Sequence, residues 1–238
     1  MNLFVANWKM HMTRGEARAY ARDLANLLGE GEPGVELVIA PPLTALEEVK
    51  DSRKRWSIAA QNVASEFEGA YTGEVSARML ADAGCRYVLV GHSERRRLFA
   101  ETGPVLARKL ARAREAGLTP IYCVGETREE REEGLTEATL TAQVETLVED
   151  PADAPLVVAY EPVWAIGAGR AATPRDAGAA RRLLAELLSG RRDVRILYGG
   201  SVNSENAREL LVACEVDGFL IGGASLKAST FVRIAGLV

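Results

Sequence analysis

Short apolar runs alternate with amphipathic stretches along most of this 238-residue chain. The apolar runs are continuous, which is typical of parallel strands covered on both faces. They predict strands at residues 3–7, 35–40, 56–61, 87–91, 119–125, 156–160, 195–200 and 218–223. Apolar residues at helical spacing predict helices over 14–28, 103–116, 136–148, 174–188 and 203–211, with shorter ones after Thr44 and Ser76 and a last one from Ser229.

Eight strand–helix units in about 240 residues predict a single α/β domain, residues 1–238, folded as a (β/α)8 barrel of eight parallel strands ringed by helices. The alternative is a doubly wound open sheet, which carries a glycine fingerprint after its first strand. Here the first strand runs into Asn-Trp-Lys-Met without a glycine, and no low-complexity linker divides the chain. We therefore expect the barrel, with its chemistry at the carboxyl ends of the strands.

Composition narrows the class of protein. The net charge of -4 disfavours a basic surface for nucleic acid, and no apolar run reaches the ~18 residues of a membrane span. The amino-terminal stretch predicts a strand rather than a signal peptide. Three scattered cysteines, Cys85, Cys123 and Cys214, fit reduced thiols better than a disulfide framework. We therefore expect a cytoplasmic protein, with Cys123 serving core packing.

Two polar residues end the first predicted strand. Strand alternation would send the side chains of Asn7 and Lys9 to the same side, into the mouth of the barrel. A compact ammonium group there suits an anionic substrate, although a lone lysine at a strand end is often only solvated.

A histidine and a glutamate follow two other strands. His92 comes directly after the fourth strand, where Ser93 predicts a helix start as a residue near the N-cap. A helix N-terminus disfavours the cationic imidazole and would leave a neutral hydrogen-bond donor; the alternative is a purely structural capping histidine. Glu161 ends the sixth strand beside an apolar segment, and exclusion of water there would raise its pKa. The alternative for Glu161 is an ion pair with an arginine.

Paired glycines follow the last two strands, at 199–200 and 222–223. If they lead into helix starts, their backbone N–H groups form an anion site where these barrels usually hold phosphate. The charged run over 126–134 predicts a solvated helix start. The predicted barrel mouth thus has a base, a neutral acid, a cation and a phosphate site, and the sequence shows no metal-ligand cluster and no nucleotide fingerprint. This combination indicates cofactor-free proton transfer beside a carbonyl of a small phosphorylated compound.

Six motifs occur in order across nearly the whole chain: NWKM, GHSERR, CVGET, AYEPVWAIG, YGGSV and GGASL. Together they closely resemble the triosephosphate isomerase family. The resemblance implies the TIM-barrel fold and a cofactor-independent isomerase of glycolysis and gluconeogenesis. Such an enzyme interconverts dihydroxyacetone phosphate and D-glyceraldehyde 3-phosphate by proton transfer through an enediolate.

The resemblance also implies roles for individual residues. Glu161 matches the base, His92 the electrophile and proton shuttle, Lys9 the cation that stabilises the enediolate, and Asn7 its polar neighbour. Ser93 matches the residue that holds the glutamate in the open site, and Glu94 the partner of Lys9. The phosphate donors match Gly167, Ser201, Gly222 and Gly223. The flexible lid matches Pro162, Val163, Trp164, Ala165, Ile166, Gly167, Ala168, Gly169 and Arg170.

The family forms homodimers and sometimes tetramers. Residues 69–76 resemble its interdigitating loop, in which Thr72 reaches the neighbouring active site, and Glu74 and Arg95 match a pair that often bridges subunits. The lid departs from the family's usual Thr-Gly-Lys ending, with Ala168 and Arg170 at its first and last positions. Two alternatives stay open, namely a non-catalytic phosphate-binding barrel and another phosphosugar enzyme that uses a metal or a Schiff-base lysine within a strand.

Overall fold

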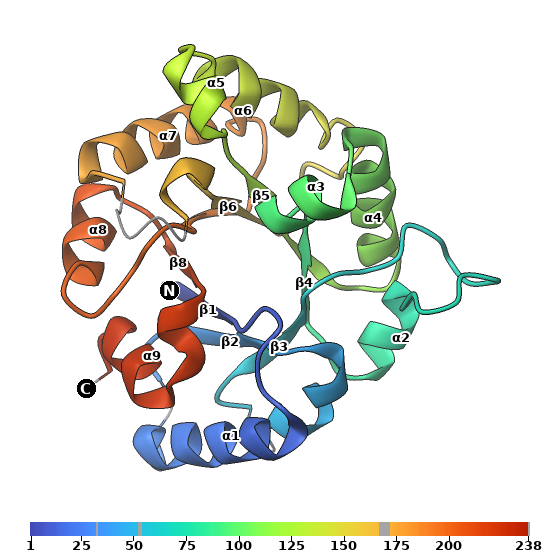
Figure 1. Cartoon of the computed structure of the whole chain (residues 1–238), viewed down its shortest axis with the longest axis vertical. Coiled ribbons are helices and arrows are strands. Elements are labelled where there is room, and N and C mark those ends of the chain that lie inside the picture. The colour runs from blue at the N-terminus through green and yellow to red at the C-terminus, as the bar shows by residue number, and fades with distance from the viewer. Residues whose placement is uncertain (32, 52–53, 167–171, 238) are drawn as a thin grey trace.

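The fold is a closed barrel, seen here in a computed structural model that describes residues 1–31, 33–51, 54–166 and 172–237. Within these residues, eight parallel strands pair in chain order and helices ring them on the outside (Figure 1). The strands are β1 (Leu3–Asn7), β2 (Glu36–Ala40), β3 (Ser57–Ala60), β4 (Tyr87–Val90), β5 (Thr119–Val124), β6 (Leu156–Tyr160), β7 (Val194–Tyr198) and β8 (Gly218–Ile221). The predicted fold class is confirmed.

The helices alternate with the strands along the chain. They are α1 (Arg14–Leu28), α2 (Ala77–Asp82), α3 (Ser93–Phe99), α4 (Gly103–Glu115), α5 (Arg128–Glu132), α6 (Thr136–Glu145), α7 (Pro174–Leu187), α8 (Ala207–Ala213) and α9 (Ala228–Ile234). Short 3-10 turns lie at Leu43–Ala45, Glu47–Val49, Val163–Ala165 and Gly223–Leu226. No helix in the described parts of the chain is both long and apolar enough to cross a membrane.

Two hydrophobic layers explain why the strands are apolar throughout. In β1, Leu3 and Val5 belong to the cluster inside the barrel, whereas Phe4 and Ala6 pack in the layer between strands and helices. Successive side chains of a strand point to opposite faces, so a strand with a layer on each side needs an apolar residue at every position.

The chain after β7 and the chain around Thr44 differ from the helices predicted from the sequence. After β7 the helix begins at Ala207 rather than at residue 203, because the side chain of Asn203 accepts the backbone N–H groups of Glu205 and Asn206 and forms a turn. Around Thr44 the chain forms two 3-10 turns, Leu43–Ala45 and Glu47–Val49, where a short α-helix was expected after Thr44. The glycines at 199–200 therefore lead into a turn and not directly into a helix.

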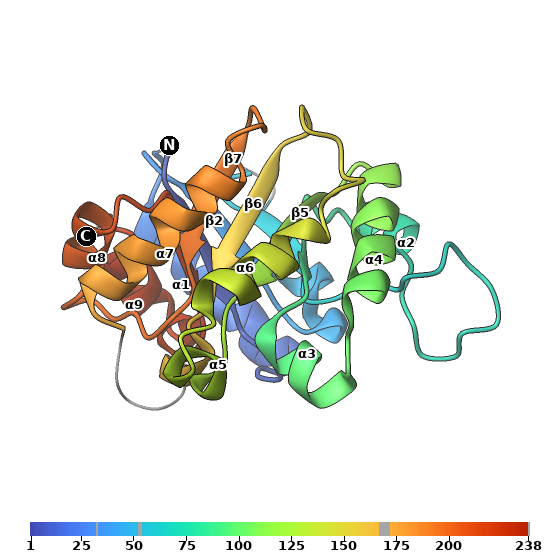
Figure 2. The same cartoon turned by 90° about the horizontal axis from the view of Figure 1, so that it is seen from above.

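A long loop between β3 and α2 projects from the side of the barrel (Figure 2). Its base is closed by the backbone N–H of Ala64, which donates to the carbonyl oxygen of Val75 at 2.9 Å. Its tip exposes the side chains of Phe67 and Tyr71. An exposed loop that carries aromatic residues is a candidate contact surface for another chain.

Candidate active site

A pocket of about 280 Å³ lies at the carboxyl ends of the strands. Its polar lining brings together the predicted site residues Asn7, Lys9, His92, Glu161, Ser201, Gly222 and Gly223. Apolar side chains from three separate regions of the chain, Ile166, Val202 and Leu220, complete the wall. A pocket of this size fits a small molecule, and its polar groups would fix the orientation of that molecule.

Lys9 reaches the pocket by a turn and not by strand alternation. β1 ends at Asn7, and Lys9 adopts a left-handed backbone conformation with φ of 53°. The backbone N–H of Lys9 donates to Oδ1 of Asn7 at 3.0 Å, and the side-chain amide of Gln61 donates to the carbonyl oxygen of Lys9 at 2.9 Å. A left-handed non-glycine residue costs roughly 1 kcal/mol, which these contacts offset. Nζ of Lys9 lies 2.7 Å from Oε1 of Glu94, as the expected pairing requires.

His92 is the N-cap of α3, where the sequence suggested Ser93. Its Nδ1 accepts the backbone N–H of Glu94 at 3.2 Å. A nitrogen that accepts a hydrogen bond carries no proton, so the neutral imidazole bears its proton on Nε2. Nε2 faces the pocket and lies 3.0 Å from Oε1 of Glu161. His92 thus serves both as the helix cap and as a pocket residue, which the sequence analysis had treated as alternatives.

The Glu161 carboxylate is 2% exposed and is held by two groups. One oxygen contacts His92, and the other accepts the backbone N–H of Ser93 at 2.8 Å. Burial raises the pKa of Glu161, but the contacts with His92 and Ser93 outweigh it and the net pKa is lowered. The expectation of a raised pKa was wrong for this arrangement, because it considered burial alone. The partner of Glu161 is a histidine and not an arginine.

The same contact acts on the imidazole. Burial lowers the pKa of His92, and the adjacent carboxylate of Glu161 raises it by more, so that the net pKa is raised. From the sequence we expect the helix N-terminus to dominate and to keep the ring neutral. The helix does supply the Glu94 N–H that opposes protonation of Nδ1, but the glutamate contact was not foreseen.

The predicted phosphate residues form one side of the pocket. The hydroxyl of Ser201 donates to the carbonyl oxygen of Ala165 at 3.0 Å, which ties this side to the segment after Glu161. Gly222 is so close to Lys9 that an added Cβ would lie 3.4 Å from the lysine Cε. Backbone N–H groups beside a lysine provide a suitable environment for a phosphate dianion.

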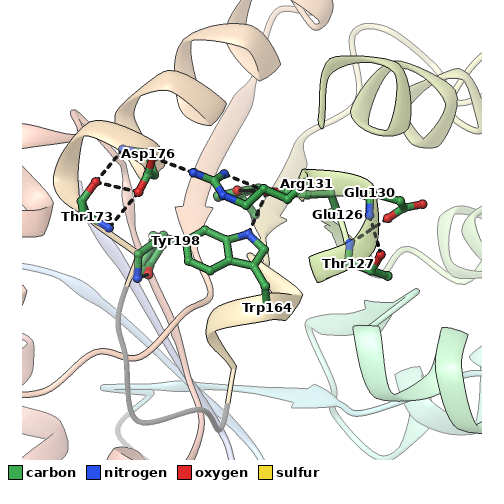
Figure 3. A network of polar contacts seen from close by, with 10 residues as sticks. Glu126, Thr127, Glu130, Arg131, Trp164, Thr173, Asp176 and Tyr198 are labelled. Carbon is green, nitrogen blue, oxygen red and sulfur yellow. Dashed lines mark hydrogen bonds and ion pairs between the residues drawn. The ribbon is translucent and has the colours of Figure 1, made fainter. Parts of the chain in front are cut away.

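Glu126 was misjudged from the sequence. The charged run over 126–134 does contain the start of a helix, α5, at Arg128, but Glu126 precedes this helix and is completely buried, so the expectation of a solvated position was wrong for Glu126. The carboxylate accepts the hydroxyl of Tyr160 at 3.0 Å and the indole N–H of Trp164 at 2.9 Å (Figure 3). Its position directly after β5 is the signal that marks it, because the carboxyl ends of the strands hold the functional residues of such barrels.

The lid and the dimer loop are described in part. Of the predicted lid, residues 162–166 are described and contain the 3-10 turn Val163–Ala165, whereas Gly167, Ala168, Gly169 and Arg170 lie outside the described residues. In the projecting loop Thr72 and Glu74 are exposed. Arg95 donates to Oε1 of Glu101 at 2.7 Å within its own chain. The lid and the bridge between subunits stay predictions.

The described residues contain no group of three or more histidine, cysteine, aspartate or glutamate side chains arranged to hold a metal ion. None of the described strands carries a lysine: Lys109 lies in α4 and Lys227 follows a 3-10 turn. The pocket instead pairs a buried carboxylate with an imidazole N–H and a cation. Such a set can move a proton and stabilise the negative charge that develops on an oxygen.

Comparisons with known proteins agree with this geometry. A sequence model of the family described as triosephosphate isomerase matches residues 2–238. The triosephosphate isomerase of Chloroflexus aurantiacus is 48% identical and spans 98% of this chain and 97% of its own length. That of Thermus thermophilus is 47% identical, with 98% of each chain covered. The crystal structure of triosephosphate isomerase from Bartonella henselae matches with a TM-score of 0.88 at 36% identity, over 99% of this chain and 98% of that one. This chain belongs to the triosephosphate isomerase family.

Proposed function

We propose that this chain interconverts dihydroxyacetone phosphate and D-glyceraldehyde 3-phosphate, and that residues 1–238 act as one domain in the cytoplasm. The observation that carries the proposal is the contact of Glu161 with His92 in a pocket that also contains Lys9. A base, a neutral donor and a cation are the groups needed to isomerise a hydroxyketone without a cofactor.

The base in this proposal is Glu161. Its carboxylate takes a proton from the carbon beside the carbonyl and later returns it to the neighbouring carbon. To do so, the carboxylate has to leave at least one of the two groups that now hold it, His92 or Ser93. These contacts lower its pKa, so their loss leaves burial as the main effect and strengthens the base when the proton is transferred.

The electrophile is His92. With its proton on Nε2, the imidazole can donate to the carbonyl oxygen and stabilise the enediolate that forms. The Glu94 N–H at Nδ1 keeps this tautomer and orients the ring. Lys9 and Asn7 line the same pocket and supply a cation and an amide beside the developing charge.

The substrate phosphate is expected beside Ser201, Gly222 and Gly223. This side of the pocket offers backbone N–H groups, a hydroxyl and the nearby Lys9. An anchor at the phosphate would place the reacting carbons at a fixed distance from the base, which accelerates proton transfer by orientation.

We also infer that the chain is a homodimer, with a tetramer as the alternative. A groove of about 720 Å³ shares Lys9 and His92 with the site and is lined on its outer side by exposed Leu43, Leu98 and Phe99. The loop that exposes Tyr71 would fill a matching groove on a second copy. Sedimentation at micromolar and nanomolar protein tests this, and a monomer with full activity would contradict it.

The function is tested by a coupled assay with glyceraldehyde 3-phosphate, applied to the natural chain and to Glu161→Gln. We expect rapid turnover that the variant loses by a factor of about 10³ or more, because glutamine cannot accept the proton. Binding of phosphoglycolate without turnover in the natural chain would favour the non-catalytic barrel. Near-full activity of Glu161→Gln would contradict the assignment of the base.

A further inference from the structure

Arg131 of α5 contacts residues that lie at or beside the two ends of the segment joining β6 to α7 (Figure 3). At the first end its Nη1 donates to Oε1 of Glu126 at 3.3 Å, and its guanidinium stacks over the ring of Trp164 at 4.3 Å. At the second end its Nη2 donates to Oδ1 of Asp176, in the first turn of α7, at 2.7 Å. One planar group therefore links the two ends.

The first end surrounds the proposed base. Tyr160 directly precedes Glu161 and Trp164 follows it by three residues, and both donate to the carboxylate of Glu126. Glu126 is completely buried, so its charge has to be compensated by a cation, and Arg131 provides one. The guanidinium thus contacts the carboxylate to which Tyr160 and Trp164, on the two sides of Glu161, are hydrogen-bonded.

The second end fixes the start of α7. Oδ2 of Asp176 accepts both the hydroxyl and the backbone N–H of Thr173, in a capping box. The other oxygen, Oδ1, accepts the hydrogen bond from Nη2 of Arg131. Each oxygen thus has a separate function, one in the helix cap and one in the link to α5.

We propose that Arg131 is a positioning residue for Glu161, which couples the start of α7 to the backbone around the base through Glu126 and Trp164. This inference rests on the proposed function. Lysine cannot replace the arginine, because a single ammonium group lacks both the forked donors and the plane that stacks on the indole.

Kinetics of Arg131→Lys and Asp176→Asn test the proposal. Asparagine keeps an oxygen for the Thr173 cap and loses the charge that attracts Arg131. We expect kcat to fall by about tenfold in both variants, since small displacements of a catalytic group slow the reaction strongly. KM should change much less, because Lys9 and Ser201 are untouched.

Two control variants match these changes. Arg175→Lys alters an exposed arginine next to Asp176 in α7. Glu130→Gln removes the charge of an equivalent capping residue in α5, next to Arg131. Both should keep the kcat of the natural chain. A fall in kcat as large as in the test variants would show a general sensitivity of these helices and overturn the proposal.

A spectroscopic signature separates coupling from a general structural role. The indole N–H of Trp164 donates to Glu126, so its NMR resonance reports the position of that carboxylate, while the indole of Trp56, bonded to the carbonyl oxygen of Val49, is the internal reference. We expect Asp176→Asn to shift the Trp164 resonance although it changes a residue at the other end. The variant that combines Arg131→Lys with Asp176→Asn should lose little more kcat than Arg131→Lys alone, because both substitutions break the same contact between Arg131 and Asp176.

A lowered melting temperature with unchanged kcat and an unchanged Trp164 resonance would overturn the proposal, as would fully additive losses in the double variant. The proposed function can fail separately. If the natural chain has no isomerase activity, the resonance of Trp164 still shows whether Asp176 and Trp164 are coupled.

Discussion

The carboxylate of Glu161 and the imidazole of His92 are in direct contact, with Oε1 and Nε2 3.0 Å apart and both side chains buried. The pKa of the glutamate is lowered and that of the histidine is raised by this contact. The proposed base is therefore held in its charged form by the proposed electrophile. A substrate oxygen that accepts a hydrogen bond from Nε2 of His92 would replace this contact. Substrate binding and activation of the base are therefore linked.

The backbone N–H of Ser93 is the second group that holds this base, and Ser93→Pro removes it. Ser93 is the first residue of α3, where the N–H has no partner within the helix and proline is well tolerated. Loss of the donor should raise the pKa of Glu161. We expect the acid side of the pH profile of kcat/KM to move to higher pH, because this profile reports groups of the free enzyme.

Ser93→Ala keeps the N–H and is the control for Ser93→Pro. The acid side of its pH profile of kcat/KM should coincide with that of the natural chain. An equal displacement in both variants would assign the effect to the hydroxyl, and no displacement in either would show that the N–H does not set the pKa.

Two glycines at the site should respond to alanine in different ways, one through stability and the other through substrate binding. A Cβ at Gly125 would lie 1.8 Å from the carbonyl oxygen of Glu161, so Gly125→Ala should cost about 2 kcal/mol or more of unfolding free energy and lower kcat. At Gly223 a Cβ meets no atom within 4 Å, but this residue lines the pocket. Gly223→Ala should leave the melting temperature unchanged and raise KM. Thermal unfolding and steady-state kinetics of both variants distinguish these effects; equal losses of stability would contradict the geometry.

The barrel could be predicted from the sequence because every one of its strands needs the same pattern, a run of apolar residues at consecutive positions. Each strand has an apolar layer on both faces, so a run such as 156–160 is apolar at every position and is bounded by helical patterns. Helix starts were less predictable. The turn at Asn203 depends on a side chain that competes with the helix for backbone N–H groups, and periodicity does not report this.

Site residues such as Glu161, which lie directly at a strand end, could be predicted from the sequence. The contacts that these residues make with residues far away in the sequence could not. The pKa of Glu161 depends on His92, 69 positions earlier, and the burial of Glu126 depends on Trp164 and Tyr160 from the next strand and its loop. Local sequence marked Glu126 as part of a charged run, and only the closed barrel shows that it faces the segment after the base.

The ion pair of Lys9 with Glu94 should affect binding rather than stability. The two side chains are 28% and 38% exposed, so solvent weakens the interaction. Glu94→Gln keeps the backbone N–H that donates to Nδ1 of His92 and should raise KM by about fivefold at most, with no change in melting temperature. Lys9→Met, which removes the cation from the pocket, should impair kcat/KM far more. Equal effects of the two variants would show that Lys9 acts only through its glutamate partner.

Glu36 links three strands at the opposite end of the barrel and should make stability depend on pH. Its carboxylate accepts a hydrogen bond from the hydroxyl of Tyr87 and another from Nη1 of Arg195, which lies 2.6 Å from Oε2 of Glu36. Burial raises the pKa of Glu36, but these contacts outweigh it and the net pKa lies below its ordinary value of 4.5. The native state then binds fewer protons than the unfolded one, so the stabilisation is complete above 4.5 and is lost as pH falls through the native pKa.

Glu36→Gln should therefore lower the free energy of unfolding by about 2 kcal/mol at neutral pH, the scale of a lost charged hydrogen bond. The difference from the natural chain should shrink as the pH falls below 4.5, because the natural side chain becomes neutral as well. Urea unfolding across this range measures it, with Glu149→Gln on the exposed surface as the control. A difference that stays constant with pH would mean that the lost stability comes from packing or from neutral hydrogen bonds, and not from the charge on Glu36.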